Sequence, residues 1–320
     1  MSGGNSVGAG FRIRALSEAD LPHARGVHRK AFGAFLGIPP EKFRPSADCL
    51  GPRWRMWKNG GLVALDGDRL IGSGLLMHWG AGCILGPLTV DPDAWGRGVA
   101  RQLAGAMMDI IDAAQFEWAG LFTHPQSPMH VRLYEEFGFS MQRITAVQSK
   151  AISGAIPLAS SALFSTFCEA EKMRCLTSLR ALSDTIWPGL DWRREVQSVD
   201  HEKLGDTALL WSGDQLDGFA VIHVGKDSEA SENEALVKVS AIRHGVGNGK
   251  RFSRLLSLID TAAVHLGSAK VVAGTNTGRH EAYRMMRAHG YRTDVNGVAM
   301  FRPAADIYNQ TGRFVIDDWR

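Results

Sequence analysis

A glycine-bearing turn between an apolar run and an amphipathic run is the strongest indication of chemistry in this 320-residue sequence. The segment LTVDPDAWGRGVARQL (Leu88–Leu103) predicts a strand, a turn, and a helix that begins at once. The first amides of a helix lack internal partners and lie at the positive end of its dipole, so this turn can hold an anion. Gly96 and Gly98 let the main chain approach a ligand, and Ala100 leaves the floor clear. A strand–helix turn without a ligand is the alternative, because short glycine patterns are weakly specific.

An ordered set of strands and helices must hold this turn in place. Ser17 with Asp20 gives a capping-type start to a first helix, and the segment 39–58 predicts either a loop or a short helix. The expected strands are 11–16, 62–65, 70–79, 84–90, 119–123 and 144–149, and the expected helices are 17–35, 97–116 and 129–137. The order βαβββαβαβ predicts an α+β fold with a mixed sheet rather than a doubly wound one.

The sequence also contains an internal repeat. DGDRLIGSGLL (Asp66–Leu76) is similar to SGDQLDGFAVI (Ser212–Ile222), each with a Gly-Asp turn between apolar runs. HVRLYEEFGF (His130–Phe139) is similar to AYRMMRAHGY (Ala282–Tyr291), where a helical pattern stops at a glycine. The offset between the copies grows along the chain, and the polar run at 226–235 explains this as a loop insertion. We therefore expect two similar domains in tandem.

The expected boundaries follow from this repeat. The N-terminal domain covers 1–150 and begins with a loose tail at 1–10. A linker lies at 151–175, and the C-terminal domain covers 176–320.

Composition excludes several classes of partner. The 36 basic and 33 acidic side chains give a net charge of +3, too little to attract nucleic acid or an anionic membrane. The 11 histidines have no zinc-type spacing and the four cysteines form no C-x-x-C pair, so we expect no metal. The N-terminus does not have the pattern of a signal peptide, and the most apolar stretch is broken by Gly154 and Pro157. A soluble, cytoplasmic protein is the expectation.

The turn resembles the coenzyme A loop of the GNAT superfamily of N-acetyltransferases, in which V-x-P and then Q/R-x-x-G-x-G/A open a helix. Val90, Pro92, Gly98 and Ala100 match that pattern, whereas Trp95 stands where the family has glutamine or arginine. RLYEEFGF at 132–139 is similar to the family's L-Y-E-K-x-G-F, and IRALSEADLPHARGVHRKAF reads like its first strand and helix. The tandem layout and the ending FVIDDWR resemble a bacterial group of two-domain GNAT proteins.

This resemblance implies acetyl-CoA as co-substrate and assigns roles to particular residues. Tyr134 is at the family's tyrosine position and would protonate the departing thiolate, with packing as the alternative role. The strand before the loop carries no carboxylate, so His124, or less favourably His78, is the candidate base, and a chain of water molecules is the alternative. The residues expected to bind the cofactor are Leu88, Thr89, Val90, Trp95, Gly96, Arg97, Gly98, Val99, Ala100 and Arg101. Among these, the two arginines can add charge-assisted hydrogen bonds to phosphate.

Aromatic and basic residues before the second strand are candidates for the acceptor side. Trp54, Trp57 and Trp79 either line an acceptor pocket or pack in the core. Arg53 and Arg55 either recognise a carboxylate on the acceptor or form a solvated pair.

The second copy of the repeat departs from the pattern. Its loop keeps Gly247 and Gly249, but we place Arg251 where a small residue should form the floor, and Met286 at the position of Tyr134. We therefore expect a degenerate domain that has lost its chemistry. The family resemblance implies that such a domain can complete a substrate cleft across the interface. The final segment, Phe314–Arg320, alternates like a strand that belongs to this domain or pairs with the first.

The sequence thus predicts an acyl-CoA-dependent N-acyltransferase that acts on the amine of a small molecule, as a monomer or homodimer. A non-catalytic acyl-CoA sensor or interaction module is the alternative, and turnover with an amine separates the two. An acyl-CoA decarboxylase, with Thr123-His124 holding a carboxylate, is the third possibility.

Overall fold

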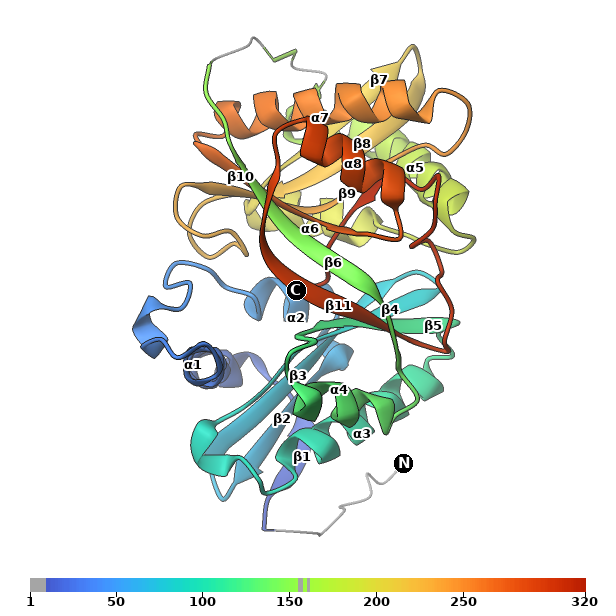
Figure 1. Ribbon diagram of the computed structural model, residues 1–320. Helices are drawn as coiled ribbons and strands as arrows, with labels where there is room; N and C mark the ends of the chain where they lie inside the picture. Colours follow the sequence, from blue (N-terminus) through green and yellow to red (C-terminus); the bar gives the residue numbers. More distant parts are fainter. Residues whose placement is uncertain (1–9, 155–157, 160–161) are drawn as a thin grey trace.

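One continuous mixed sheet of twelve strands runs through the molecule (Figure 1). The computed structural model describes residues 10–320 except 155–157 and 160–161, so residues 1–9 of the expected tail at 1–10 and part of the expected linker lie outside the described residues. No helix in the described part of the chain is long and apolar enough to cross a membrane.

The first half, residues 10–151, follows the predicted order of elements. Its strands are β1 (Arg12–Ala15), β2 (Gly61–Asp66), β3 (Arg69–Trp79), β4 (Gly82–Val90), β5 (Trp118–Thr123) and β6 (Ser140–Ala151). Its helices are α1 (Leu21–Leu36), α2 (Gly51–Met56), α3 (Val99–Ala113) and α4 (Pro128–Glu135), with 3-10 turns at η1 (Glu18–Asp20), η2 (Pro40–Lys42), η3 (Lys58–Gly60) and η4 (Pro92–Ala94). The segment predicted as a loop or short helix therefore contains α2 and two 3-10 turns.

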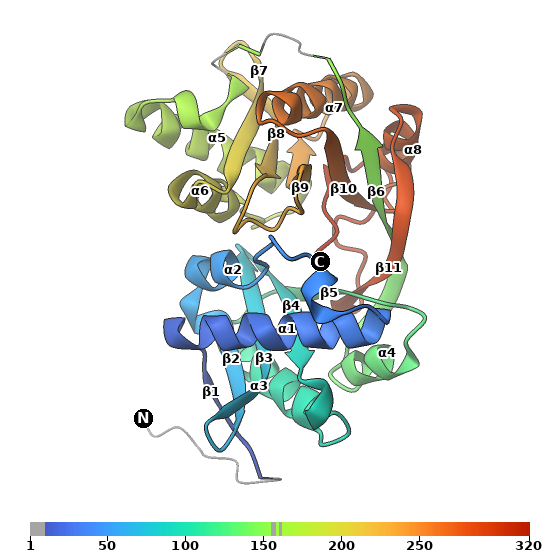
Figure 2. The same ribbon diagram turned by 90° about the vertical axis from the view of Figure 1, so that its left-hand side faces the viewer.

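Local chemistry explains where the first helix begins and ends. The amide and hydroxyl of Ser17 both donate to Asp20, at 2.8 and 2.6 Å, as the capping pattern predicts. Helix α1 ends at Gly37, whose φ of 69° is in the left-handed region that favours glycine. The helix passes in front of the sheet of the first half (Figure 2).

The second half, residues 163–320, repeats the first. Its strands are β7 (Gly205–Ser212), β8 (Gln215–His223), β9 (Glu234–Ile242), β10 (Lys270–Asn276), β11 (Arg292–Arg302) and β12 (Val315–Ile316). Its helices are α5 (Glu169–Ile186), α6 (Arg193–Glu202), α7 (Asn248–His265) and α8 (His280–Ala288), after a 3-10 turn η6 (Phe164–Thr166). Helix α5 begins inside the range expected to be a linker, and the polar run predicted as an insertion lies in the loop between β8 and β9.

The two halves exchange their last long strands. Strand β11 lies between β5 and β6, and β6 lies between β11 and β10, so each half's sheet continues into a strand of the other half. In Figure 1 the green β6 and the red β11 run side by side across the middle of the molecule. Thr145 of β6 pairs with Gly297 of β11, and these residues are counterparts in the repeat. An approximate twofold axis therefore passes between them.

A shared core joins the halves as well. Trp79 of β3 packs edge-on against Trp192, with ring centroids 6.0 Å apart, and Trp118 of β5 stacks on Trp319 at 6.2 Å. All four rings are at most 5% exposed. Because buried aromatic rings of this size contribute several kcal/mol each, the halves form one unit. The fold is α+β with two similar mixed domains, as predicted.

Candidate functional site

The clearest opening in the sheet of the first half lies between β4 and β5. The two strands pair in parallel only over Gly82–Leu85 and Trp118–Leu121, and then they separate. Beyond the separation, Leu88–Val90 pairs with β3 on one side alone. The other side of this segment faces the gap between β4 and β5.

The alternation of backbone groups assigns two amides of β4 to the gap. Asp91 donates its N–H to the Ile71 carbonyl of β3 at 2.8 Å, so the N–H of Thr89 also points toward β3. The amides of Leu88 and Val90 therefore point the opposite way, into the gap. The Trp95 indole donates to the Val90 carbonyl at 2.9 Å, from the same side. Trp95, which stands where the family has glutamine or arginine, thus links the turn to the strand that precedes it.

The turn after β4 leads directly to an open helix start. Gly98 is the N-cap of α3, in the left-handed conformation (φ 79°, ψ 8°), and no side chain in the described part of the chain caps the helix. A Cβ placed on Gly96 or on Gly98 would meet no atom within 4 Å. The first amides of α3, at Val99–Arg101, therefore lie at a helix start without a side-chain cap, next to glycines that leave room for an anion.

The two arginines of the turn have carboxylate partners. Arg97 contacts Asp66 at 2.8 Å, and Arg101 makes a two-pronged contact with Glu136 at 2.8 and 2.7 Å. Both pairs are substantially exposed, and exposed ion pairs contribute at most about 1 kcal/mol. A phosphate at the helix start can therefore compete for either guanidinium at low cost.

Helix α4 places Tyr134 in the core of the first half. The side chain is 9% exposed, packs against Phe139 with ring centroids 6.2 Å apart, and shares a cluster with Val90 and Leu121 on the two separating strands. Burial raises the pKa of the Tyr134 phenol. The hydroxyl is therefore protonated at neutral pH and can donate a hydrogen bond.

His124 follows β5 directly, at the end of the gap. Its Nδ1 is buried and has no hydrogen-bond partner in the part of the chain that the structure describes. Its ring lies 4.9 Å from that of Phe35 on α1, and His130 on α4 lies 5.1 Å from the same ring. Burial lowers the pKa of both histidines, and His130 lowers that of His124 further. Both imidazoles are therefore neutral at neutral pH.

The sequence interpretation did not consider His130. It precedes Tyr134 by four residues on the same helix, so the two side chains share one face. That spacing was available in the sequence and would have identified the residue.

The structure places His78 away from this group. It lies opposite Cys83 in the paired part of β3 and β4. Cys83 comes five residues before Leu88, so His78 is far along the strand from the gap. Its ring packs edge-on against Trp57 and Phe116 at 5.7 and 4.9 Å.

Trp54 and Trp79, two of the tryptophans considered for the acceptor side, are packed in the core. Trp54 is 5% exposed and donates to the Leu16 carbonyl at 3.1 Å. Trp79 is 1% exposed and donates to Glu195 of α6 at 2.6 Å. Of the alternatives for this group, core packing holds for both residues.

The proposed carboxylate-binding arginines are corrected in the same way. Arg53 is 1% exposed and paired with Glu229, while Arg55 is paired with Glu202 of α6. The carboxylates that they bind in the structure belong to the second half of the chain and not to an acceptor.

The second half has the same gap, but the chain fills it. Strands β9 and β10 pair over Glu234–Val237 and Lys270–Ala273 and then separate, with β12 inserted between them. Ile242, the counterpart of Val90, donates its amide to the Phe314 carbonyl at 3.3 Å. The final segment is thus a strand of the second half, and its continuation reaches the first half, where Trp319 packs against Gly120.

Buried contacts hold this inserted strand. Arg279 donates to the Val315 carbonyl at 3.0 Å and to the Asp317 carboxylate at 2.7 Å, and both charged side chains are 1% exposed. Residues 314–317 are at most 6% exposed. An extended ligand cannot enter this gap while β12 is in place.

The loop of the second half requires one correction. The N-cap of α7 is Gly247 (φ 81°, ψ 16°), which matches Gly98, so Gly249 takes the place of Ala100. The small residue at the floor is therefore retained. Arg251 lies one turn into the helix and folds back onto the Val246 carbonyl. The inserted β12, rather than Arg251, is what distinguishes this loop from its counterpart.

Comparison with known proteins identifies a family for the first half. Residues 23–139 match the model of the acetyltransferase (GNAT) family. No curated protein gives a significant match to the chain.

Several solved structures share the fold over nearly the whole chain. A Pyrococcus horikoshii protein whose proposed activity is acetyl transfer has a TM-score of 0.70 at 14% identity, covering 100% of this chain and 98% of its own. A GCN5-related N-acetyltransferase from Sphaerobacter thermophilus has a TM-score of 0.60 at 15% identity, with coverages of 93% and 96%. A tandem GNAT protein from the clavulanic acid biosynthesis pathway has a TM-score of 0.55 at 12% identity, with coverages of 91% and 98%. At these identities the structures establish the fold alone, while the family model covers residues 23–139. The first half of the chain therefore matches the acetyltransferase (GNAT) family over residues 23–139, and the whole chain has the fold of two-domain GNAT structures.

Proposed function

We propose that the first half transfers an acyl group, most simply acetyl, from acyl-CoA to the amine of a small molecule. Family and fold support an acyl-CoA-dependent N-acyltransferase in general. One observation carries the proposal further. Among the described residues, the gap-side amides of β4 have no strand partner. The strand continues directly into a helix start without a side-chain cap, whereas the same gap in the second half is filled by an extended segment.

The cofactor-binding residues divide between these two features. The N–H groups of Val99–Arg101 would bind the pyrophosphate, since Gly96 and Gly98 leave room for it. The gap-side carbonyl of Leu88 and amide of Val90 would bind the extended pantetheine arm, as the amide of Ile242 binds the segment of β12. The thioester at the end of that arm supplies the activated acyl group.

Three groups of this chain would then act on the reacting atoms. The Leu88 amide would stabilise the negative charge that develops on the thioester oxygen as the amine attacks. His124 would accept the proton from the amine nitrogen, for which its neutral imidazole is suited. Tyr134 would give its proton to the departing sulfur, because burial keeps the phenol protonated until a thiolate forms beside it.

Turnover tests the proposal against the sensor alternative. The purified chain is incubated with acetyl-CoA and a panel of small primary amines, and free thiol is measured. The proposal predicts thiol release that depends on an amine. Acetyl-CoA binding without release for any amine would support a sensor, and carbon dioxide release from malonyl-CoA without an amine would support a decarboxylase.

The pH dependence of the rate tests His124. Because the pKa of His124 lies below its usual value, kcat/KM should stay level near pH 7 and fall as the imidazole is protonated at lower pH. His124→Ala should lower the rate at pH 7 by about a hundredfold and remove this acid limb. A profile unchanged by the substitution would transfer the role to His130 or to water.

A further inference from the structure

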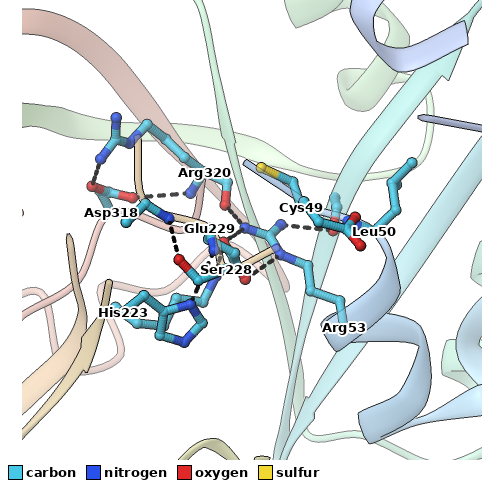
Figure 3. Close-up of polar contacts among 12 residues, drawn as sticks. Cys49, Leu50, Arg53, His223, Ser228, Glu229, Asp318 and Arg320 are labelled. Atoms are coloured by element: carbon cyan, nitrogen blue, oxygen red, sulfur yellow. Dashed lines mark hydrogen bonds and ion pairs between the residues drawn. The ribbon is translucent and has the colours of Figure 1, made fainter. Parts of the chain in front are cut away.

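A buried cluster of charged groups joins the two halves beside the gap (Figure 3). The Arg53 guanidinium of α2 makes a two-pronged contact with Glu229, at 2.9 and 2.5 Å, and Glu229 also accepts from Lys238 of β9 at 2.8 Å. Arg53 further donates to the main-chain oxygen of Arg320. We call Arg53, Glu229 and Lys238 the junction cluster.

Glu229 is ionised although the junction cluster is buried. The side chains of Arg53, Glu229 and Lys238 are 1%, 3% and 6% exposed. Burial alone would raise the pKa of Glu229, but Arg53 and Lys238 outweigh burial and hold that pKa well below its usual value. Burying such charges is costly, and a buried ion pair is weak evidence of a contribution to stability. The junction cluster also fixes the position of the Arg53 guanidinium next to strand β4.

On β4, Arg53 contacts Gly86. Strand β4 pairs with β5 only up to Leu85 and with β3 again from Leu88, so Gly86 and Pro87 form a bulge outside both registers. The Gly86 carbonyl accepts a hydrogen bond from Arg53 Nη1 at 3.1 Å. The guanidinium thus links the bulge to a carboxylate of the second half, 176 residues along the chain.

We infer that Arg53 is a positioning residue for acyl transfer, set in place by the second half. Held by Glu229, it fixes the Gly86 carbonyl and thereby the orientation of the gap-side amide of Leu88, two residues further on. This inference rests on the proposed function, which gives that amide to the thioester oxygen. The second half then contributes to the chemistry of the first without binding a cofactor.

Other contacts hold the halves together without touching the bulge. Arg55, on the same helix as Arg53, binds Glu202 of α6 at 2.5 Å, and Trp79 binds Glu195. Arg55 therefore provides a matched control at the same interface. If Arg53 merely helped the halves adhere, its substitution would change the stability of the folded chain without a selective change in kcat or in amide exchange across 85–90.

The experiment compares Arg53→Lys with Arg55→Met. Lysine keeps the charge opposite Glu229 but lacks the second nitrogen that reaches Gly86. We expect Arg53→Lys to lower kcat by about tenfold or more while the Kd for acetyl-CoA stays within about twofold, since a small displacement at the reacting centre affects chemistry before binding. Arg55→Met should leave both quantities close to wild type.

Amide hydrogen exchange across 85–90 gives a readout that does not depend on turnover. Exchange in this segment should be faster in Arg53→Lys and unchanged in Arg55→Met. Glu229→Gln, which removes charge without changing volume, should give the same direction of change and replaces Arg53→Lys if that variant fails to fold. Unchanged exchange and kcat in a folded Arg53→Lys or Glu229→Gln, or equal losses in Arg55→Met, would overturn the inference. Absence of turnover in the wild type would overturn the proposed function, while the exchange measurement would still decide the positioning role.

Discussion

Tyr134→Phe is expected to lower kcat by about a hundredfold or more while the fold and the affinity for acetyl-CoA remain unchanged. The ring is 9% exposed and packs against Phe139, and phenylalanine preserves that packing. The hydroxyl makes no hydrogen bond with the residues that the structure describes, so its removal leaves no partner unsatisfied. The substitution would remove the hydroxyl that, in the proposed mechanism, gives its proton to the departing sulfur.

Tyr291→Phe is the matched control for this substitution. Tyr291 is the counterpart of Phe139 in the second half, is fully buried, and has a hydroxyl without a partner in the described chain. Its substitution should change neither kcat nor the affinity for acetyl-CoA. Equal kcat in wild type and Tyr134→Phe, measured where chemistry limits the rate, would exclude the phenol as the acid.

Local patterns were sufficient to predict most elements of the fold. The capping pattern at Ser17, the apolar face of the helix after the glycine turn, and the glycine stop at Gly138 each depend on residues within a few positions of one another. The repeat then gave the second half by comparison. Each of these features is local, and each was found in the expected place.

The strand exchange and the inserted β12 could not be predicted in the same way. The alternation in 144–149 indicates a strand, but a strand has the same pattern whichever sheet it joins. FVIDDW likewise indicates a strand without indicating a gap between two others. Both outcomes depend on how two copies of one fold meet, which is a long-range property.

The residues of the candidate site also differ in whether they could be predicted from local sequence patterns. The glycine turn and Tyr134 lie in contiguous motifs, so sequence reasoning could find them. The partners of Arg53 are a glutamate 176 residues away and a carbonyl in a bulge, and no local pattern indicates either. The placement of Arg251 was wrong because the two loops differ in length, and only the helix start at Gly247 fixes their alignment.

The central claim is that the first half is open to acyl-CoA and the second is closed, and a matched pair of substitutions tests it. Gly98 and Gly247 cap their helices in nearly the same left-handed conformation, and a Cβ on either meets no atom within 4 Å. Aspartate tolerates this conformation better than most residues, so both glycine-to-aspartate variants should fold. At Gly98 the added negative charge would oppose a pyrophosphate, and we expect a loss of affinity of about a hundredfold. At Gly247 no cofactor is expected to bind, so affinity should not change.

The measurement is calorimetric titration of the full chain with acetyl-CoA, on the wild type and on both variants. The account predicts one site per chain in the wild type and in Gly247→Asp, and binding greatly weakened in Gly98→Asp. Two sites per chain, or a loss of binding in Gly247→Asp, would show that β12 does not close the second half. No binding of acetyl-CoA or of longer acyl thioesters to the wild type would contradict the proposed function itself.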